Sequence, residues 1–162
     1  MFRPMRRHVQ ALTDDEIKRI LERNTSGVLA LSGDEGYPYA VPMSYVYADG
    51  KIYFHCARQG HKIDAVRRDD KASFCIIDQD EILPEKYTTC FRSVIAFGKM
   101  RILEADDEKR AALEKLAEKY RPGHTEDRDR AIHAEFRGVC IMELSPEHIT
   151  GKEAIELVKR RT

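Results

Sequence analysis

The sequence predicts a mainly β protein, a closed or partly open antiparallel barrel with helices packed on its outside. About six segments of strand length are rich in β-branched and aromatic residues and are separated by turns that contain Gly or Pro. Few segments show helical periodicity. Strands and helices do not alternate along the chain, which disfavours a doubly wound parallel sheet.

The first elements follow from a capping signal and an alternating pattern. Thr13 to Glu16 reads T-x-x-E, a capping box, and it precedes an amphipathic helix that runs to about Arg23. The segment GVLALS at 27–32 then alternates as a strand. We therefore expect a short helix that flanks the first strand.

Residues 37–55 are expected to form two strands joined by Asp49-Gly50, a strong hairpin signal. Pro38 and Pro42 cannot donate to a strand ladder. We therefore predict an edge or a bulge in the first of these strands, around residues 41–44. Backbone groups that proline leaves unpaired there can face a ligand.

Beyond Gly60 the chain shows a short helix from His61 to about Asp69 and a strand at 71–78. Residues 79–89 contain Pro84 and little periodicity, which predicts a polar loop. A long strand follows at 90–104. Its internal Gly98 is typical of a bulge or a barrel corner.

The last third of the chain begins with a predicted helix at 106–120, which Pro122-Gly123 ends. Residues 127–136 are compatible with another helix, and 138–145 is the last clear strand. Residues 149–161 are expected as a short strand followed by a turn or a helix. The inner stripe predicted for the first of these helices consists of Ala111, Leu113, Leu116, Ala117 and Tyr120.

Composition and charge limit the classes of function. The chain of 162 residues has 28 Lys and Arg against 28 Asp and Glu, so no overall field favours nucleic acid or an anionic membrane. The longest apolar stretches are strand-sized, and the start MFRPMRRHVQ lacks the apolar core of a signal peptide. We therefore expect one cytoplasmic domain, 1–162, with 1–12 as an N-terminal arm, that binds neither nucleic acid nor membrane.

The cysteines show neither CxxC spacing nor a paired framework, which favours reduced thiols. Cys75 and Cys140 lie in apolar strand patterns and are expected in the core. Cys56 follows His55, but adjacent strand residues point to opposite faces, which disfavours a nucleophilic Cys–His pair. His55, Cys56 and His61 lack a fourth ligand at useful spacing, so no metal site is predicted.

Bases lie at an unusual end of the helix that follows Gly60. His61 and Lys62 occupy its first turn and Arg58 lies just before it, although a helix N-terminus carries a partial positive charge. Two explanations are open. A solvated first turn tolerates bases at a cost of a few tenths of a kcal/mol, or an anion such as phosphate is held there by backbone N–H groups and the flanking bases. The second explanation predicts a cleft beside Lys62.

Four motifs in this order resemble the nitroimidazole-resistance (Nim) family of flavoproteins: YPYAVPMSYVY, IYFHCARQGHKIDAV, FRSVIAFGKMRIL and ITGKE. That family belongs to the pyridoxamine 5'-phosphate oxidase-like FMN-binding split barrels. The likeness extends from about Asp14 to Lys159, and four motifs in register are more specific than any one. The resemblance implies a split antiparallel β-barrel of the FMN-binding type, and a homodimer with FMN in clefts at the subunit interface.

The resemblance also implies site residues. The backbone of 41–44 would lie along the flavin ring, 55–57 would line the ring edge and the ribityl chain, and the phosphate would lie at the helix start. Residues 92–93 would reach the cofactor from the fifth strand, and 151–152 would approach it from the partner subunit. The implied cofactor contacts are Val41, Pro42, Met43, Ser44, His55, Cys56, Ala57, Gly60, His61, Lys62, Arg92, Ser93, Gly151 and Lys152.

His55 matches the family's histidine at the end of the third strand, and it is the candidate for handling substrate or a proton beside the flavin. The alternative is an ordinary imidazole bonded to backbone. The basic cluster that pyridoxamine phosphate oxidase uses for its substrate's phosphate is not found, because the terminal run Lys159-Arg160-Arg161 is typical of solvated charge. Vitamin B6 oxidation is therefore disfavoured.

Two functions remain open. In the first, FMN accepts electrons from a reduced nicotinamide or another donor and passes them to a small organic acceptor, such as a nitro compound. In the second, the protein stores or senses a flavin or a haem without turnover, since fold does not fix function.

Overall fold

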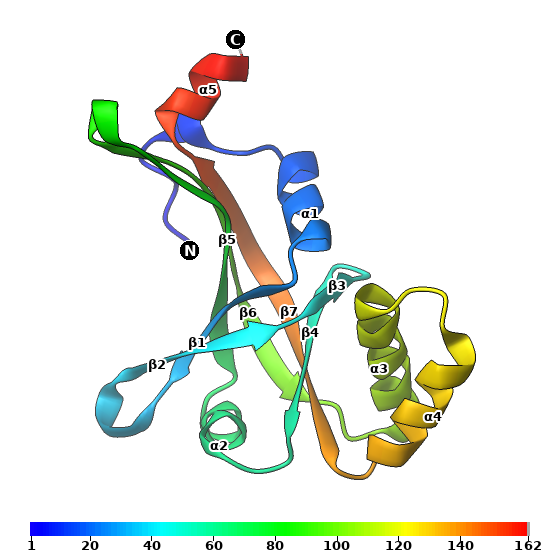
Figure 1. The fold of residues 1–162 in the computed structure, drawn as a ribbon. Coiled ribbons are helices and arrows are strands. Elements are labelled where there is room, and N and C mark those ends of the chain that lie inside the picture. Colours follow the sequence, from blue (N-terminus) through cyan, green and yellow to red (C-terminus); the bar gives the residue numbers. More distant parts are fainter. Residues whose placement is uncertain (162) are drawn as a thin grey trace.

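Seven antiparallel strands form one sheet in the computed structural model, which describes residues 1–161 (Figure 1). The hydrogen-bonded order of the strands is β2-β1-β5-β6-β7-β4-β3. Their bounds are β1 Ser26–Ser32, β2 Pro38–Ser44, β3 Val46–Ala48, β4 Lys51–Ala57, β5 Lys71–Leu83, β6 Thr88–Ile102 and β7 Val139–Glu153.

The helices lie around this sheet; α3 packs on β3, β4 and β7, and α4 lies beside α3 (Figure 1). The helices are α1 Asp14–Arg23, α2 His61–Arg68, α3 Asp106–Tyr120, α4 Thr125–Glu135 and α5 Ile155–Arg161, with short 3-10 turns at His8–Gln10, Asp34–Gly36 and Pro84–Lys86. None of the helices in 1–161 is both long and apolar enough to span a bilayer.

The predicted capping box of α1 is confirmed. The backbone N–H of Glu16 donates to Thr13 Oγ1 at 3.3 Å, and the Thr13 N–H donates to Glu16 Oε2 at 2.8 Å. Two of the otherwise unpaired N–H groups at the helix start are thereby satisfied. Ile17, Ile20 and Leu21 turn inward from this helix into the core.

The chain around Tyr45 shapes the barrel. β2 and β3 lie at opposite ends of the strand order, yet only Tyr45 separates them, so the sheet must curl until its two edges approach. Tyr45 is fully buried, its hydroxyl donates to the Leu21 carbonyl at 2.8 Å, and its ring meets Phe74 edge-on. β2 and β3 are the two edge strands and no ladder joins them, so the sheet does not close, and the predicted split-barrel fold is confirmed.

The Asp49-Gly50 hairpin is confirmed, with φ of 53° and 76° at the two residues. The prediction of a single strand before this hairpin turn is wrong, because the strand breaks at Tyr45 into β2 and β3. β2 is an edge strand, as Pro38 and Pro42 predict, but it pairs with β1 in unbroken register, so the bulge does not occur within β2. Proline is tolerated because its missing donor lies on an edge strand.

The polar loop predicted at 79–89 is wrong. β5 continues to Leu83 and β6 starts at Thr88, and the two pair up to Leu83↔Thr88 with a register shift between Ile77 and Gln79. The result is a long hairpin that extends from the body of the molecule, at the upper left in Figure 1. The sequence pattern does not predict this hairpin, because its strands carry polar side chains without apolar alternation. Backbone hydrogen bonds of the ladder, rather than an apolar face, hold the two strands together.

β7 is one strand of fifteen residues, Val139–Glu153, and not the two short strands predicted from its sequence. A register shift between Phe97 and Gly98 of β6 accommodates Pro146 in the partner strand, which confirms the bulge predicted at Gly98. A Cβ at Gly98 would lie 2.1 Å from the Ser145 carbonyl oxygen. Glycine is therefore required where the two backbones approach.

The buried face of α3 differs from the predicted stripe. Ala112 and Leu116 are buried, while Ala111 and Tyr120 are exposed. The face is set by packing on β3, β4 and β7, which the helical pattern alone does not specify. Of the two cysteines expected in the core, Cys140 is buried and Cys75 is half-buried.

Candidate functional site

A pocket of about 580 Å³ opens where β2 and β4 separate, at the split of the barrel. We call it the split pocket. Met43 of β2, the end of β4 and Lys62 of α2 form one side, and the segment that joins α4 to β7 forms the other. Its lining residues are Met43, His55, Cys56, Ala57, Lys62, Ala134, Glu135, Gly138 and Val139. The cleft predicted beside Lys62 is therefore confirmed.

The end of β4 places three consecutive residues at this pocket. Phe54 is fully buried and packs edge-on against Phe74, which fixes the strand in the core. The residues beyond it leave the core, so that the side chain of His55 is exposed and that of Cys56 is half-buried. His55 thus presents an imidazole to the pocket from a rigid strand.

The surroundings of the Cys56 thiol disfavour its thiolate form. Burial, followed by the neighbouring Cys140, raises the pKa of Cys56 to about 12, and the opposing effect of Lys62 is smaller. Cys140 lies directly opposite Cys56 in the pairing of β4 with β7. Within residues 1–161 no cluster of His, Cys, Asp and Glu side chains could hold a metal ion.

Helix α2 begins at Gly60, whose φ of 120° favours glycine. No atom lies within 4 Å of the position that a Cβ would take at Gly60, so the space before the helix is open. Gly60 O accepts from the Ile63 N–H at 2.9 Å. The Lys62 side chain is half-buried and lines the pocket beside this helix start.

The side chain of His61 does not line the split pocket. Its ring stacks on Tyr39 with 4.0 Å between centroids, and its Nε2 lies 3.5 Å from Asp34 Oδ2. Arg58 donates from Nη1 to the Arg137 carbonyl at 3.0 Å, which ties the turn before α2 to the segment after α4. Of the three bases that the sequence groups here, only Lys62 lines the split pocket.

The predicted ring contacts on β2 lie along the open edge of the sheet. Met43 is buried and lines the pocket, and Val41 packs partly buried against the main core. Pro42 and Ser44 are exposed. The backbone of this strand pairs on one side only, with β1, so its other side faces the split.

The predicted residues of β6 and β7 lie at the far end of the sheet. Ser93 pairs with Lys152 and Val94 with Gly151, whereas Val139 at the start of β7 lies at the split pocket. At about 3.3 Å per residue, Gly151 is roughly 35–40 Å from Val139 along the strand. One chain therefore does not bring these residues to the pocket.

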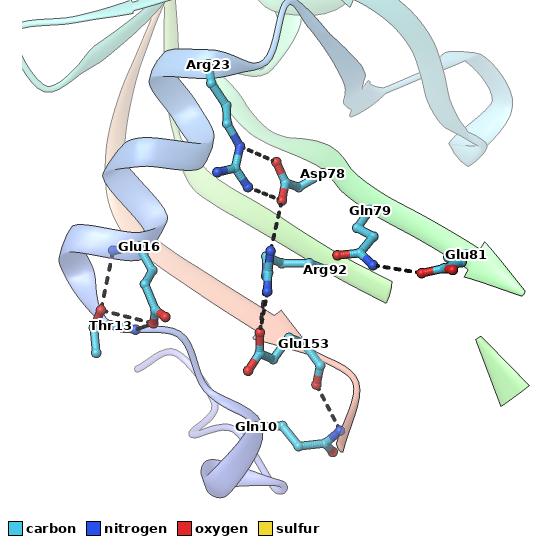
Figure 2. A network of polar contacts seen from close by, with 9 residues as sticks. All are labelled: Gln10, Thr13, Glu16, Arg23, Asp78, Gln79, Glu81, Arg92 and Glu153. Carbon is cyan, nitrogen blue, oxygen red and sulfur yellow. Dashed lines mark hydrogen bonds and ion pairs between the residues drawn. The ribbon is translucent and has the colours of Figure 1, made fainter. Parts of the chain in front are cut away.

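Arg92 belongs to a polar network at that far end (Figure 2). Its guanidinium donates to Glu153 Oε2 at 3.0 and 3.1 Å and lies 3.7 Å from Asp78, which also pairs with Arg23. Burial alone would raise the pKa of Asp78, but hydrogen bonds from Arg23 and Asn24 outweigh it and the pKa is lowered. The network joins α1, β5, β6 and β7.

Gly151 and Lys152 have structural contacts of their own. A Cβ at Gly151 would lie 2.6 Å from Ile17 Cγ1, so glycine allows α1 to pack closely on β7. Lys152 Nζ lies 5.4 Å from the centre of the Phe91 ring.

Sequence reasoning missed the second wall of the pocket, formed by Ala134, Glu135, Gly138 and Val139. Ala57 pairs with Val139 across β4 and β7, which brings this wall to the pocket. The one local signal is Gly138, which stands between a helical segment and a strand segment.

An open antiparallel sheet with this strand order and flanking helices defines the split-barrel class of folds. The family model described as pyridoxamine 5'-phosphate oxidase matches residues 13–153. The chain belongs to this family. No curated protein sequence matches it.

Solved structures support the same fold. The chain is similar to a candidate 5-nitroimidazole antibiotic resistance protein from Bacteroides thetaiotaomicron, with a TM-score of 0.74, 23% identity, and coverage of 88% of this chain and 86% of that one. It is similar to a conserved hypothetical protein from Mycobacterium tuberculosis, with a TM-score of 0.81, 20% identity and coverage of 93% and 90%. It is also similar to an FAD- and haem-binding protein from Mycobacterium smegmatis, with a TM-score of 0.78, 20% identity and coverage of 90% and 73%.

Proposed function

We propose that this chain is an FMN-dependent oxidoreductase that reduces a small organic acceptor, such as a nitroaromatic compound. One observation carries the proposal: Lys62, in the first turn of α2, lines the split pocket. Backbone N–H groups at a helix start and a flanking lysine suit a phosphate. The family match and the likeness to a candidate nitroimidazole-resistance protein support it.

The residues present fit FMN. The pocket of about 580 Å³ lies within the usual range for small-molecule sites, roughly 300–1,000 Å³. Lys62 would hold the phosphate beside Gly60, and the backbone of 41–44 would lie along the ring at the open sheet edge. Met43, Cys56 and Ala57 would supply the less polar wall. The neutral Cys56 thiol suits this role, because it adds no charge beside the ring.

Bound FMN would supply the redox chemistry, taking up two electrons from a donor and passing them to an acceptor. The protein's part is to position the groups and to handle a proton. His55 lines the pocket from the end of β4, and its imidazole would donate a proton to the acceptor as that acceptor is reduced. The strand fixes the backbone position of His55 at the pocket.

We further propose a homodimer with FMN at its interface. Arg92, Ser93, Gly151 and Lys152 lie too far along the sheet to reach the pocket of their own chain, so a partner subunit would have to bring them there. Exposed apolar side chains on β5 and its hairpin support a covered surface, since Ile77, Ile82 and Tyr87 are 62, 71 and 98% exposed. The free cysteines suit a reducing compartment, and we propose a cytoplasmic location.

A second function has one observation in its favour. The exposed imidazole of His55 at the pocket is the type of side chain that ligates haem iron, and one similar structure is that of an FAD- and haem-binding protein. The chain would then bind a flavin or a haem for storage or sensing, without turnover.

The absorption spectrum of the purified protein tests both functions. FMN gives flavin bands, and anaerobic NADH or NADPH should bleach them, with recovery of colour on addition of a nitroimidazole. Flavin bands that stay oxidised with every donor would favour the binding function, and a Soret band would favour haem. A colourless protein that takes up neither cofactor on titration would refute the proposal.

A further inference from the structure

Two of the four cysteines lie directly opposite each other in the sheet. Cys56 of β4 and Cys140 of β7 are partners in the antiparallel ladder, and both are free thiols. The ladder partners of Cys75 and Cys90 are residues of other types. Among residues 1–161, Cys56 and Cys140 are therefore the only two cysteines that face each other across neighbouring strands.

The positions of Cys56 and Cys140 meet the backbone requirement for a disulfide. Directly opposed residues of an antiparallel ladder have Cα atoms about 4.5–5.5 Å apart, and their side chains project from the same face of the sheet. A disulfide needs Cα atoms about 4.4–6.8 Å apart. The two side chains also interact directly: burial is the largest cause of the raised pKa of Cys56, and a hydrogen bond with the Cys140 side chain adds to it. The backbone spacing therefore allows the two sulfur atoms to join while the ladder stays paired.

The split pocket gives access to one thiol of the pair. Cys56 is half-buried and lines this pocket, whereas Cys140 is buried and belongs to the main hydrophobic core. Lys62 lines the same pocket, and its positive charge favours the Cys56 thiolate, although burial has the larger effect on the pKa of Cys56. A small molecule in the split pocket therefore reaches Cys56 rather than Cys140.

We propose that Cys56 and Cys140 form a redox-active dithiol, which a small disulfide that enters the split pocket oxidises to a cross-strand disulfide. The Cys56 thiolate attacks the small disulfide, whose S–S bond breaks, and one small thiol leaves. Cys140 then attacks Cys56 Sγ in the mixed disulfide, and the second small thiol leaves. The protein loses two electrons and two protons, and the small disulfide takes up both as it becomes two thiols.

The disulfide ties the two walls of the split pocket to each other. Ala57 and Val139, the pair next to the two cysteines in the ladder, belong to opposite walls. Because burial and the Cys140 thiol raise the pKa of Cys56 to about 12, the exchange is slow at neutral pH, and small thiols reverse it. Oxidation changes the lining of the pocket whichever cofactor the pocket holds, so the inference does not depend on the proposed function.

The test uses glutathione disulfide as the probe, with the folded full chain at about pH 8.5, where more of the Cys56 thiol is ionised. Alkylation then blocks the remaining thiols, and mass spectrometry of digests identifies the linked peptides. We expect a linkage between Cys56 and Cys140, loss of two of the four thiols, and recovery of both with dithiothreitol. Unchanged thiols, a linkage of any other pair, or a stable mixed disulfide at Cys56 without the linkage would overturn the proposal.

Variants separate the two steps of the exchange. Cys140→Ser lacks the second thiol, so glutathione should stay on Cys56, with at least tenfold more mixed disulfide than in the native protein. Cys75→Ser is the matched control, because Cys75 is half-buried, burial raises its pKa, and its ladder partners are not cysteines. It should form the native linkage at a rate within twofold of the native rate.

Equal amounts of mixed disulfide in the native protein and in Cys140→Ser would show that Cys140 does not attack Cys56, and the proposal would fail. Circular dichroism checks that each variant is folded. If Cys140→Ser does not fold, the linkage found in the native protein and in Cys75→Ser still decides the result.

Discussion

Lys62 contributes a positive charge to the lining of the split pocket. We expect Lys62→Ala to weaken FMN binding about tenfold or more and riboflavin binding much less, because a charge-assisted phosphate contact contributes about 1.5–3 kcal/mol. Fluorescence titration of flavin-free protein with each ligand measures the difference. Lys18→Ala is a suitable control, since Lys18 is exposed and forms only an i,i+4 pair with Glu22. Equal losses for FMN and riboflavin would contradict the phosphate role.

The thiol pair of Cys56 and Cys140 gives a second prediction for single residues. Because burial and the Cys140 thiol raise the pKa of Cys56 to about 12, its thiolate fraction at neutral pH is very small. We expect iodoacetamide to modify Cys56 far more slowly than a free thiol at pH 7.5, with a rate that still rises with pH above 9. Mass spectrometry of timed digests measures this rate. A rate that levels off just above the ordinary thiol pKa of 9.0 would contradict the raised pKa.

Among the strands and helices, the contact between β6 and β7 depends on Gly98. We expect Gly98→Ala to destabilise the fold by about 3 kcal/mol, since its Cβ would lie 2.1 Å from a backbone oxygen that cannot move without breaking the ladder. Chemical denaturation measures this change. Gly138→Ala is the control, because its Cβ would meet only Glu135 O at an ordinary 3.6 Å. Equal stability of the two variants would place the close approach elsewhere.

A buried carboxylate joins β4, β6 and β7. Glu143 Oε1 accepts from Lys51 at 2.9 Å and from Arg101 at 2.8 Å. Burial would raise the pKa of Glu143, but these hydrogen bonds outweigh it and lower the pKa below its ordinary value of 4.5. A lowered pKa means that the ionised Glu143, bonded to Lys51 and Arg101, stabilises the fold at neutral pH. This stabilisation is lost as the pH falls below about 4.5.

Glu143→Gln should therefore be less stable than the native protein at pH 7, because it removes the carboxylate that pairs with Lys51 and Arg101. We expect a loss of about 2 kcal/mol, below that of a fully buried pair, because both bases are partly solvated. Its stability should also fall less steeply as the pH drops below about 4.5. Thermal unfolding followed by circular dichroism from pH 7 downward measures both effects. Glu114→Gln serves as the control, since Glu114 forms only an i,i+4 pair with Arg110 at 3.6 Å. Parallel pH curves for all three proteins would contradict the role given to Glu143.

The elements that the sequence predicts correctly are those whose signal lies in a few adjacent residues. The capping box at Thr13, the turn at Asp49-Gly50 and the bulge at Gly98 are predicted correctly, because each depends on the conformation of a few adjacent residues. The hairpin at 79–89 is not predicted, since its polar strands carry no apolar alternation. The break at Tyr45 is not predicted either, because it arises from tertiary packing of that ring against Phe74.

The same distinction applies to the site. One segment of sequence holds His55, Cys56, Ala57 and Lys62, so the wall that they form follows from a strand, a turn and a helix in succession. The opposite wall comes from the end of α4 and the residues that follow it, and the pairing of β4 with β7 brings it there. The direction of the His61 ring was equally beyond prediction, since Tyr39 and Asp34 belong to the β1–β2 hairpin region.

On the scale of the whole molecule, the predicted residues fall into two groups that one chain keeps apart. The split pocket lies at one end of β7, and the segment with Gly151 and Lys152 lies near the other end, beside the long β5–β6 hairpin and α5 (Figure 1). The proposed homodimer would place each group against the other twice, and it would account for both the separation and the exposed apolar side chains of the hairpin.

We therefore expect light scattering after size exclusion to give twice the mass of the chain. Ile82→Glu/Tyr87→Glu should shift the protein toward the monomer and weaken FMN binding, because charge at two highly exposed apolar positions opposes their burial between subunits. Val9→Glu, which alters a 59% exposed side chain of the N-terminal arm, is the control. A native monomer that still binds FMN tightly would show that the split pocket is complete within one chain, and Arg92 and Lys152 would then serve only the packing of β6 and β7.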